Sequence, residues 1–192
     1  MNPPSLTARH EAAHAVVAAH FDLPMCEITI VPSVVEGRHF AGCVLLAEIP
    51  EDREQLVAYA ATALAARVDA KRGVWVDIPE SSYAADDRRV REIAKSLNVP
   101  DEKYEDWRSI MLELTSKVLN VACISEAIEA VAYELDKHKT ITPEAVMGLL
   151  LLFRDSYPKE MQDAQEDIAL LSRASQTWRE EPEQSGAPGL RE

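Results

Sequence analysis

The stretch His10-Glu11-Ala12-Ala13-His14 decides how the chain is interpreted. Two histidines four residues apart lie on the same face of a helix, so that both rings can reach one metal ion. Zinc in catalytic sites accepts neutral imidazole nitrogens and keeps one coordination position open. Glu11 comes directly after the first histidine and projects beside that position, where it can take a proton from water. The motif therefore predicts a zinc site with His10 and His14 as ligands and Glu11 as the catalytic residue.

The residues around the motif predict a helix that begins at Ser5 or Thr7 and ends at Phe21, before Asp22-Leu23-Pro24. Because both histidines lie on the apolar stripe of this helix, their rings must be satisfied inside the protein. A metal ion can satisfy them, and so can hydrogen bonds to backbone carbonyls. The stripe that we expect to face the core consists of Leu6, His10, Ala13, His14, Val17 and Phe21.

A third ligand must come from elsewhere, and three candidates remain open. His20 continues the motif with the spacing of the metzincin proteases, but Val17 stands where those enzymes have the glycine that turns the chain out of the helix. A helix predicted over about 51–72 offers Asp69 but no well-placed glutamate. The third candidate is the pair Asp86-Asp87.

Asp86 is the member of that pair that the helical pattern favours. A helix is predicted from Ser81 or Ser82 to about Asn98, and its apolar stripe follows positions 86, 90, 93 and 97. An acid on a buried helix face requires a cation. Asp87 lies toward the edge of the stripe, where we expect a helix cap or a surface ion pair. Asp86 is thus the predicted third metal ligand.

These motifs resemble the peptidase domain of FtsH-type ATP-dependent zinc proteases. The resemblance implies a zinc metalloendopeptidase with Zn²⁺ held by two histidines and an aspartate, and the family's DLxxATxIA motif places that aspartate on Asp86. It covers about residues 5–150 and is most specific at the first helix. The similar segments are His10–Ala18 (family HEAGHAVVA), Glu27–Pro32, Ala41–Cys43, Asp86–Ala94 and Thr140–Val146.

The chain also departs from the family. Ala65-Ala66-Arg67 stands where the family has a helix with acidic residues, and no GxxxxGK[ST] phosphate loop is present. We therefore expect a stand-alone peptidase that cleaves unfolded or flexible polypeptides or works with a separate ATPase. The family's ring assembly implies a homo-oligomer. The alternative function is a catalytically inactive, zinc-stabilised module for protein–protein interaction.

Composition narrows the class of protein further. A formal net charge of −13 over 192 residues argues against nucleic-acid partners and anionic membrane surfaces. The longest apolar run, Val146–Phe153, is too short to span a bilayer, and no signal peptide is expected. The three cysteines, Cys26, Cys43 and Cys123, lie in apolar contexts and predict small buried side chains in a reduced, cytoplasmic compartment.

The predicted fold class is mostly α (α+β), with a small antiparallel β-sheet packed on the helix that carries the HExxH motif. One domain is expected over 1–157. The segment 158–192 is expected to consist of a C-terminal helix (158–180) and a disordered acidic tail (180–192). The segment 39–46 is the candidate sheet edge for binding a substrate strand. The remaining elements are predicted as strands at 26–32 and 39–48, a helical stretch at 102–138 with a break near 120–125, and a helix from Pro143.

Overall fold

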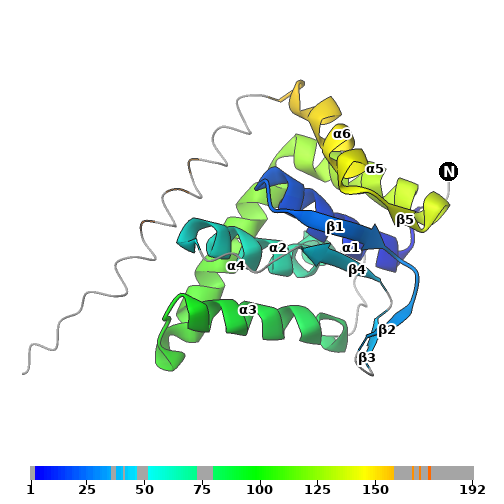
Figure 1. Ribbon diagram of the computed structural model, residues 1–192. Coiled ribbons are helices and arrows are strands. Elements are labelled where there is room, and N and C mark those ends of the chain that lie inside the picture. Colours follow the sequence, from blue (N-terminus) through cyan, green and yellow to red (C-terminus); the bar gives the residue numbers. More distant parts are fainter. Residues whose placement is uncertain are drawn as a thin grey trace, which may run out of the picture.

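Helix α1 (Leu6–His20) lies in the middle of the molecule (Figure 1). The computed structural model describes residues 3–35, 38–40, 42–46, 52–72 and 80–157, with 166, 169 and 173. Ser5 caps α1 by accepting a hydrogen bond from the backbone N–H of Ala8 at 3.2 Å, as expected for this residue type. Every residue from Glu11 to His20 is buried. The prediction that only one stripe faces the core was therefore wrong, because all sides of this part of the helix are buried. Leu6, the first member of the predicted stripe, is 45% exposed at the N-terminal end of the helix.

Six α-helices and two short 3₁₀ turns make up most of the described chain, which confirms the mostly α fold class. The break predicted near 120–125 is confirmed, because Val121 is extended (φ −67°, ψ 124°) between two helices. Ser81 and Ser82 do not cap a helix as predicted, since they lie within a 3₁₀ turn. The elements after α1 are α2 (Arg53–Arg72), η1 (Glu80–Tyr83), α3 (Ala84–Ser96), η2 (Asp101–Lys103), α4 (Tyr104–Asn120), α5 (Ala122–His138) and α6 (Pro143–Arg154).

The strands form two small antiparallel sheets, and both predicted strands differ from the observed ones: the first ends at Thr29, and the second is divided after Phe40. The strand predicted over 26–32 was too long: β1 covers Met25–Thr29, and Pro32, which has no N–H to donate, lies between it and β2 (Ser33–Val35). The three-stranded sheet has the order β4-β1-β5 and contacts α1 through β1 and β4, as predicted. Sequence reasoning missed β5. The strands are β1 (Met25–Thr29), β2 (Ser33–Val35), β3 (Arg38–Phe40), β4 (Cys43–Leu46) and β5 (Thr140–Ile141).

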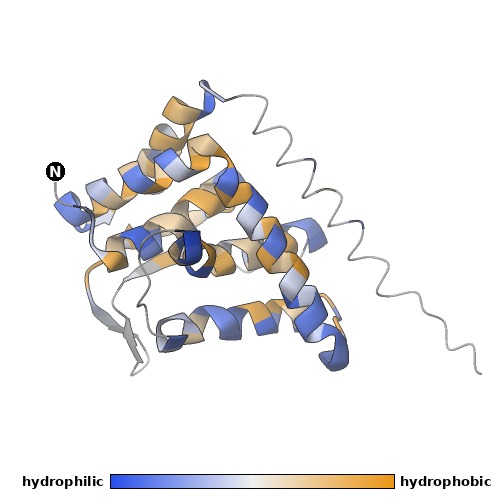
Figure 2. Cartoon of the chain, turned by 180° about the vertical axis from the view of Figure 1, so that it is seen from behind, coloured by the Kyte–Doolittle hydropathy of each residue, from blue (hydrophilic) through white to orange (hydrophobic). Residues whose placement is uncertain are grey.

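The core is continuous from α1 to the helices on both sides of it. In Figure 2 hydrophobic residues cover much of α6, whereas α3 carries many hydrophilic residues. Within the described ranges no helix is both long and apolar enough to cross a membrane. Large side chains that are almost fully buried include Val16, Leu64, Ile93, Leu114, Ile124, Ile128, Leu135 and Leu150.

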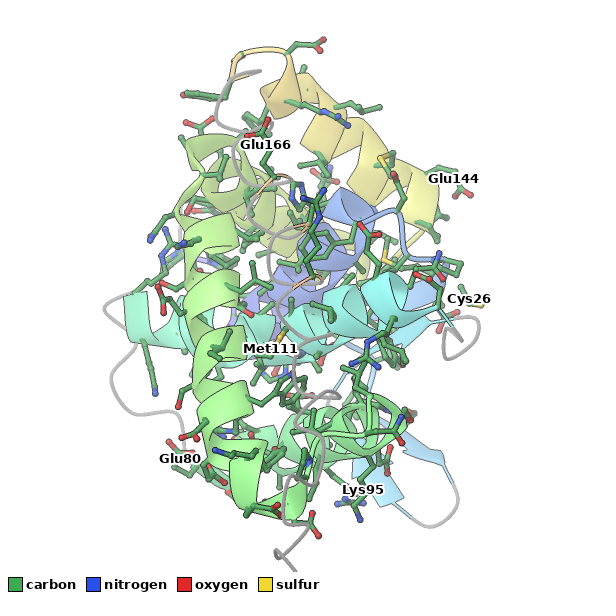
Figure 3. The ribbon with its side chains drawn as sticks, turned by 90° about the vertical axis from the view of Figure 1, so that its left-hand side faces the viewer. Cys26, Glu80, Lys95, Met111, Glu144 and Glu166 are labelled. Atoms are coloured by element: carbon green, nitrogen blue, oxygen red, sulfur yellow. The ribbon has the colours of Figure 1, made fainter. Side chains whose placement is uncertain are left out.

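The cysteine predictions had different outcomes. Cys123 is buried, as predicted, whereas Cys26 is exposed at the outer edge of the molecule (Figure 3). The prediction for Cys26 was wrong because β1 packs on α1 with one face, and Cys26 lies at the irregularity between Met25 and Glu27. The side chain of Cys43 and most of the predicted segment 158–192 lie outside the described residues.

Candidate metal centre

Three donor atoms from two helices converge on one point. His10 and His14 on α1 bring their Nε2 atoms to 3.1 Å from each other. Asp86, in the first turn of α3, places Oδ2 at 3.5 Å from the Nε2 atom of His10 and 3.6 Å from that of His14. Among the described residues this is the group of side chains that could hold a metal ion together.

The two distances from Asp86 fit a tetrahedral ion, and the 3.1 Å between the histidine nitrogens is slightly shorter than the ideal edge. Nitrogen and oxygen ligands at about 2.0–2.2 Å from zinc lie about 3.3–3.6 Å from each other along the edges of the tetrahedron. The contacts of Asp86 are also long for hydrogen bonds. Its Oδ2 atom is buried and has no hydrogen-bond partner among the described residues. A buried carboxylate oxygen without a partner is costly, so a cation between the three donors fits the residues present.

A backbone carbonyl on α2 orients the second histidine. The Nδ1 atom of His14 lies 2.7 Å from the carbonyl oxygen of Thr62. Because a carbonyl oxygen only accepts, Nδ1–H is the donor, and the lone pair of the neutral ring is left on Nε2, facing Asp86. Metal-binding histidines are fixed in this way by a partner on the other ring nitrogen.

The electrostatics of the group show how strongly it favours a cation. Burial is the largest single effect on the pKa of His14 and lowers it, but Asp86, Glu11 and the Thr62 carbonyl together raise the pKa to about 9. For Asp86, burial raises the pKa, but His14 and His10 together hold the pKa of the carboxyl well below its usual range. In the metal-free protein a proton on His14 therefore supplies the positive charge that the carboxylate requires.

Glu11 lies beside these ligands and under the sheet. Its side chain is 6% exposed, and burial raises its pKa in spite of the opposing effect of His14 and His10. Gly42, directly before β4, approaches it so closely that a Cβ atom built on the glycine would lie 2.9 Å from Cγ and 3.0 Å from Oε1 of Glu11. Because glycine has no side chain, the side chain of Glu11 can occupy this space.

The first ligand is supported by an aromatic ring. Tyr83, at the end of η1 and 4% exposed, stacks on His10 with 5.8 Å between ring centroids and an interplanar angle of 23°. On the other side of the motif, Arg9 makes a bidentate ion pair with Asp69 of α2, with distances of 2.6 and 3.1 Å. The motif helix is therefore fixed to α2 directly beside the site.

The other candidates for the third ligand do not join the group. Asp69 is paired with Arg9, and Asp87 is paired with Arg67 and Arg108. His20 is 4% exposed at the far end of α1, next to Phe21, and neither of its ring nitrogens has a partner among the described residues. Burial lowers the pKa of His20 to about 4.

Sequence reasoning missed several groups that shape the site. The carbonyl of Thr62 leaves no trace in a side-chain pattern. Gly42 lies within the segment that resembles the protease family, and its small size was the available signal. Tyr83 and Arg67 act over the interface between η1, α2 and α3, which no local spacing reveals.

Comparison with known proteins assigns neither a family nor a function to the chain. No family model matches the chain, and no curated protein matches it. The resemblance to FtsH-type peptidases therefore remains a prediction that rests on the motif residues.

Proposed function

We propose that this protein is a zinc-dependent metalloendopeptidase that hydrolyses unfolded or flexible polypeptides. The observation that carries the proposal is the convergence of His10, His14 and Asp86, with the Oδ2 atom of Asp86 buried and unpartnered. Glu11 lies next to these ligands. A donor set of two imidazoles and one carboxylate, with a general base beside it, is typical of catalytic zinc.

Different residues of the chain would orient the ligands and transfer the proton. Bound zinc would polarise the scissile carbonyl and make water a better nucleophile. Thr62 keeps His14 in the tautomer that has its lone pair on Nε2. Glu11 would accept a proton from water and pass it to the leaving amine, and its raised pKa suits a group that must hold that proton between the two steps.

The sheet supports the binding of an extended substrate. In the order β4-β1-β5, strand β4 pairs with β1 on one side and is the outer strand of the described sheet. An outer strand offers main-chain donors and acceptors to an added strand. Gly42 lies directly before β4 and next to the side chain of Glu11. The peptide bond of a substrate strand paired with β4 would therefore lie near the general base.

The test uses the full chain and an unfolded substrate such as casein, so that no unfoldase is needed. We expect about one zinc ion per chain and proteolysis that a chelator abolishes. Glu11→Gln should retain zinc but lose about 10²–10⁴-fold in activity, since the general base is removed. Glu27→Gln, at an exposed acid on β1, is the matched control. Asp86→Ala should lose zinc.

Full activity in Glu11→Gln would refute the mechanism. Stoichiometric zinc without any proteolysis by the wild type would instead support the non-catalytic binding module. Melting of that module should occur at lower temperature after chelation, because a metal that binds only the folded state stabilises it.

A further inference from the structure

The ligand Asp86 comes from a part of α3 that apolar packing does not hold. Val90 is the first buried apolar residue of α3, and all residues from Ala84 to Arg89 are at least partly exposed. No side chain caps the start of α3. Something other than the core must therefore fix the turn that presents Asp86 to the histidines.

The neighbouring residue, Asp87, is held from both sides. Its Oδ2 atom accepts a hydrogen bond from Nη2 of Arg67 on α2 at 2.6 Å, and its Oδ1 atom accepts one from Nη2 of Arg108 on α4 at 3.0 Å. Both carboxylate oxygens are thus used, on two different helices. Charge-assisted bonds of this kind are short and directional, so they fix the position of the turn as well as stabilising it.

Arg67 extends the same network to the other half of the site. Its side chain is 8% exposed, and Nη1 donates to Oε2 of Glu80 at 2.6 Å. Figure 3 shows Glu80 near one end of α4. The guanidinium also lies 4.6 Å from the ring centroid of Tyr83, and Tyr83 stacks on His10. One buried cation thus contacts the residue next to Asp86 and the ring that supports His10.

We propose that Asp87 is a positioning residue for the metal centre: held by Arg67 and Arg108, it fixes the turn of α3 that carries Asp86 at the distance a zinc ion requires from His10 and His14. The inference rests on the proposed zinc site and adds a requirement to it. Among the described residues the carboxylate of Asp87 bonds to Arg67 and Arg108 and not to a proposed ligand, so its effect reaches the site through the backbone and through Arg67 and Tyr83.

The experiment measures Zn²⁺ affinity of the full-length protein by chelator competition, and the visible spectrum of the Co²⁺-substituted protein as a signature of ligand geometry. Asp87→Asn should weaken Zn²⁺ binding about 10–100-fold, as loss of a partner outside the ligand shell does, and should alter the Co²⁺ spectrum. Glu92→Gln on the same helix, whose Arg89 pair is exposed, removes the same charge and should change neither.

Loss of stability alone must not produce this result. Leu97→Ala, near the other end of α3 and 1% exposed in the wild type, should lower the melting temperature but leave Zn²⁺ affinity and the Co²⁺ spectrum unchanged. If Asp87→Asn does not fold, Arg108→Gln decides, because it leaves Asp87 paired with Arg67; we expect several-fold weaker Zn²⁺ binding.

The outcomes separate the two proposals. Wild-type affinity and spectrum in the folded Asp87→Asn variant, or in Arg108→Gln where it is needed, would overturn the positioning role and leave the zinc site intact. A wild-type protein that binds no Zn²⁺ would overturn the proposed function, and with it this inference, before any variant is compared.

Discussion

Gly42→Ala is the sharpest test of how the sheet and the general base fit together. The structure gives no sign that Gly42 needs a glycine backbone conformation, so the substitution tests space alone. The new Cβ atom would lie 2.8 Å from the carbonyl oxygen of Thr29 and 2.9 Å from Cγ of Glu11. Since β1 holds the carbonyl, the glutamate is the part that must move.

The size of the effect follows from these distances. Carbon atoms in contact lie about 3.5–4.0 Å apart, so Glu11 must retreat by roughly 0.6–1.1 Å from its 2.9 Å position. A misplacement of about 1 Å at a catalytic group costs about 10²-fold in rate, or about 2.7 kcal/mol of activation free energy. Overpacking should also lower stability by about 1–3 kcal/mol.

The assay compares kcat/KM on an unfolded substrate, zinc content and urea unfolding. We expect activity to fall about 10²-fold while zinc is retained, because the three heavy atoms nearest to the added Cβ belong to Thr29 and Glu11 and not to a ligand. Gly148→Ala is the matched control: nothing lies within 4 Å of its added Cβ, and it should stabilise α6 by about 0.5–1 kcal/mol without loss of activity. Wild-type kcat/KM in Gly42→Ala would refute this account of how Glu11 is placed.

Two further predictions concern protonation. In the metal-free protein His14 has a pKa of about 9, so its proton must leave before a metal binds. Zn²⁺ affinity should therefore rise about tenfold per pH unit from pH 7 and become constant above about pH 9. An affinity that does not change with pH in chelator competition would contradict this prediction. His20, with a folded-state pKa of about 4, stays neutral while the unfolded chain takes up a proton below about 6.5, so folding loses stability as pH falls, by about 2 kcal/mol at pH 5. His20→Leu should remove this loss in urea unfolding of the metal-free protein and leave zinc content unchanged, whereas loss of zinc would restore His20 as a ligand.

The parts of the site that lie on one helix face were predictable from the sequence. His10 and His14 follow from their spacing, and helical periodicity placed Asp86 rather than Asp87 on the inner face of α3. The break at Val121 and the start of α6 at Pro143 also followed from local signals. In each case the information lies within one or two helical turns.

The rest depends on contacts between distant segments. Asp87 bonds to Arg67 and Arg108, which lie 20 and 21 residues away, so the expectation of a cap or a surface pair missed its role as a bridge between helices. Strand β5 was missed for a similar reason, since it pairs with β1 across more than one hundred residues. Local spacing carries no signal for such pairs.

Alanine content explains how the second histidine reaches its partner. The backbone carbonyl of Thr62 lies inside α2, and a ring on another helix can approach it only where the two helices pack closely. Small side chains at a crossing shorten the distance between helix axes. The hydroxyl of Thr62 bonds within its own helix, to the carbonyl of Ala58 at 3.0 Å, and so leaves the space free. The alanines on α1 and α2 therefore help to set the tautomer of His14, and through it the direction of Nε2. The buried alanines of these two helices are Ala8, Ala12, Ala13, Ala15, Ala18 and Ala19 on α1 and Ala58, Ala60, Ala61, Ala63, Ala65 and Ala66 on α2.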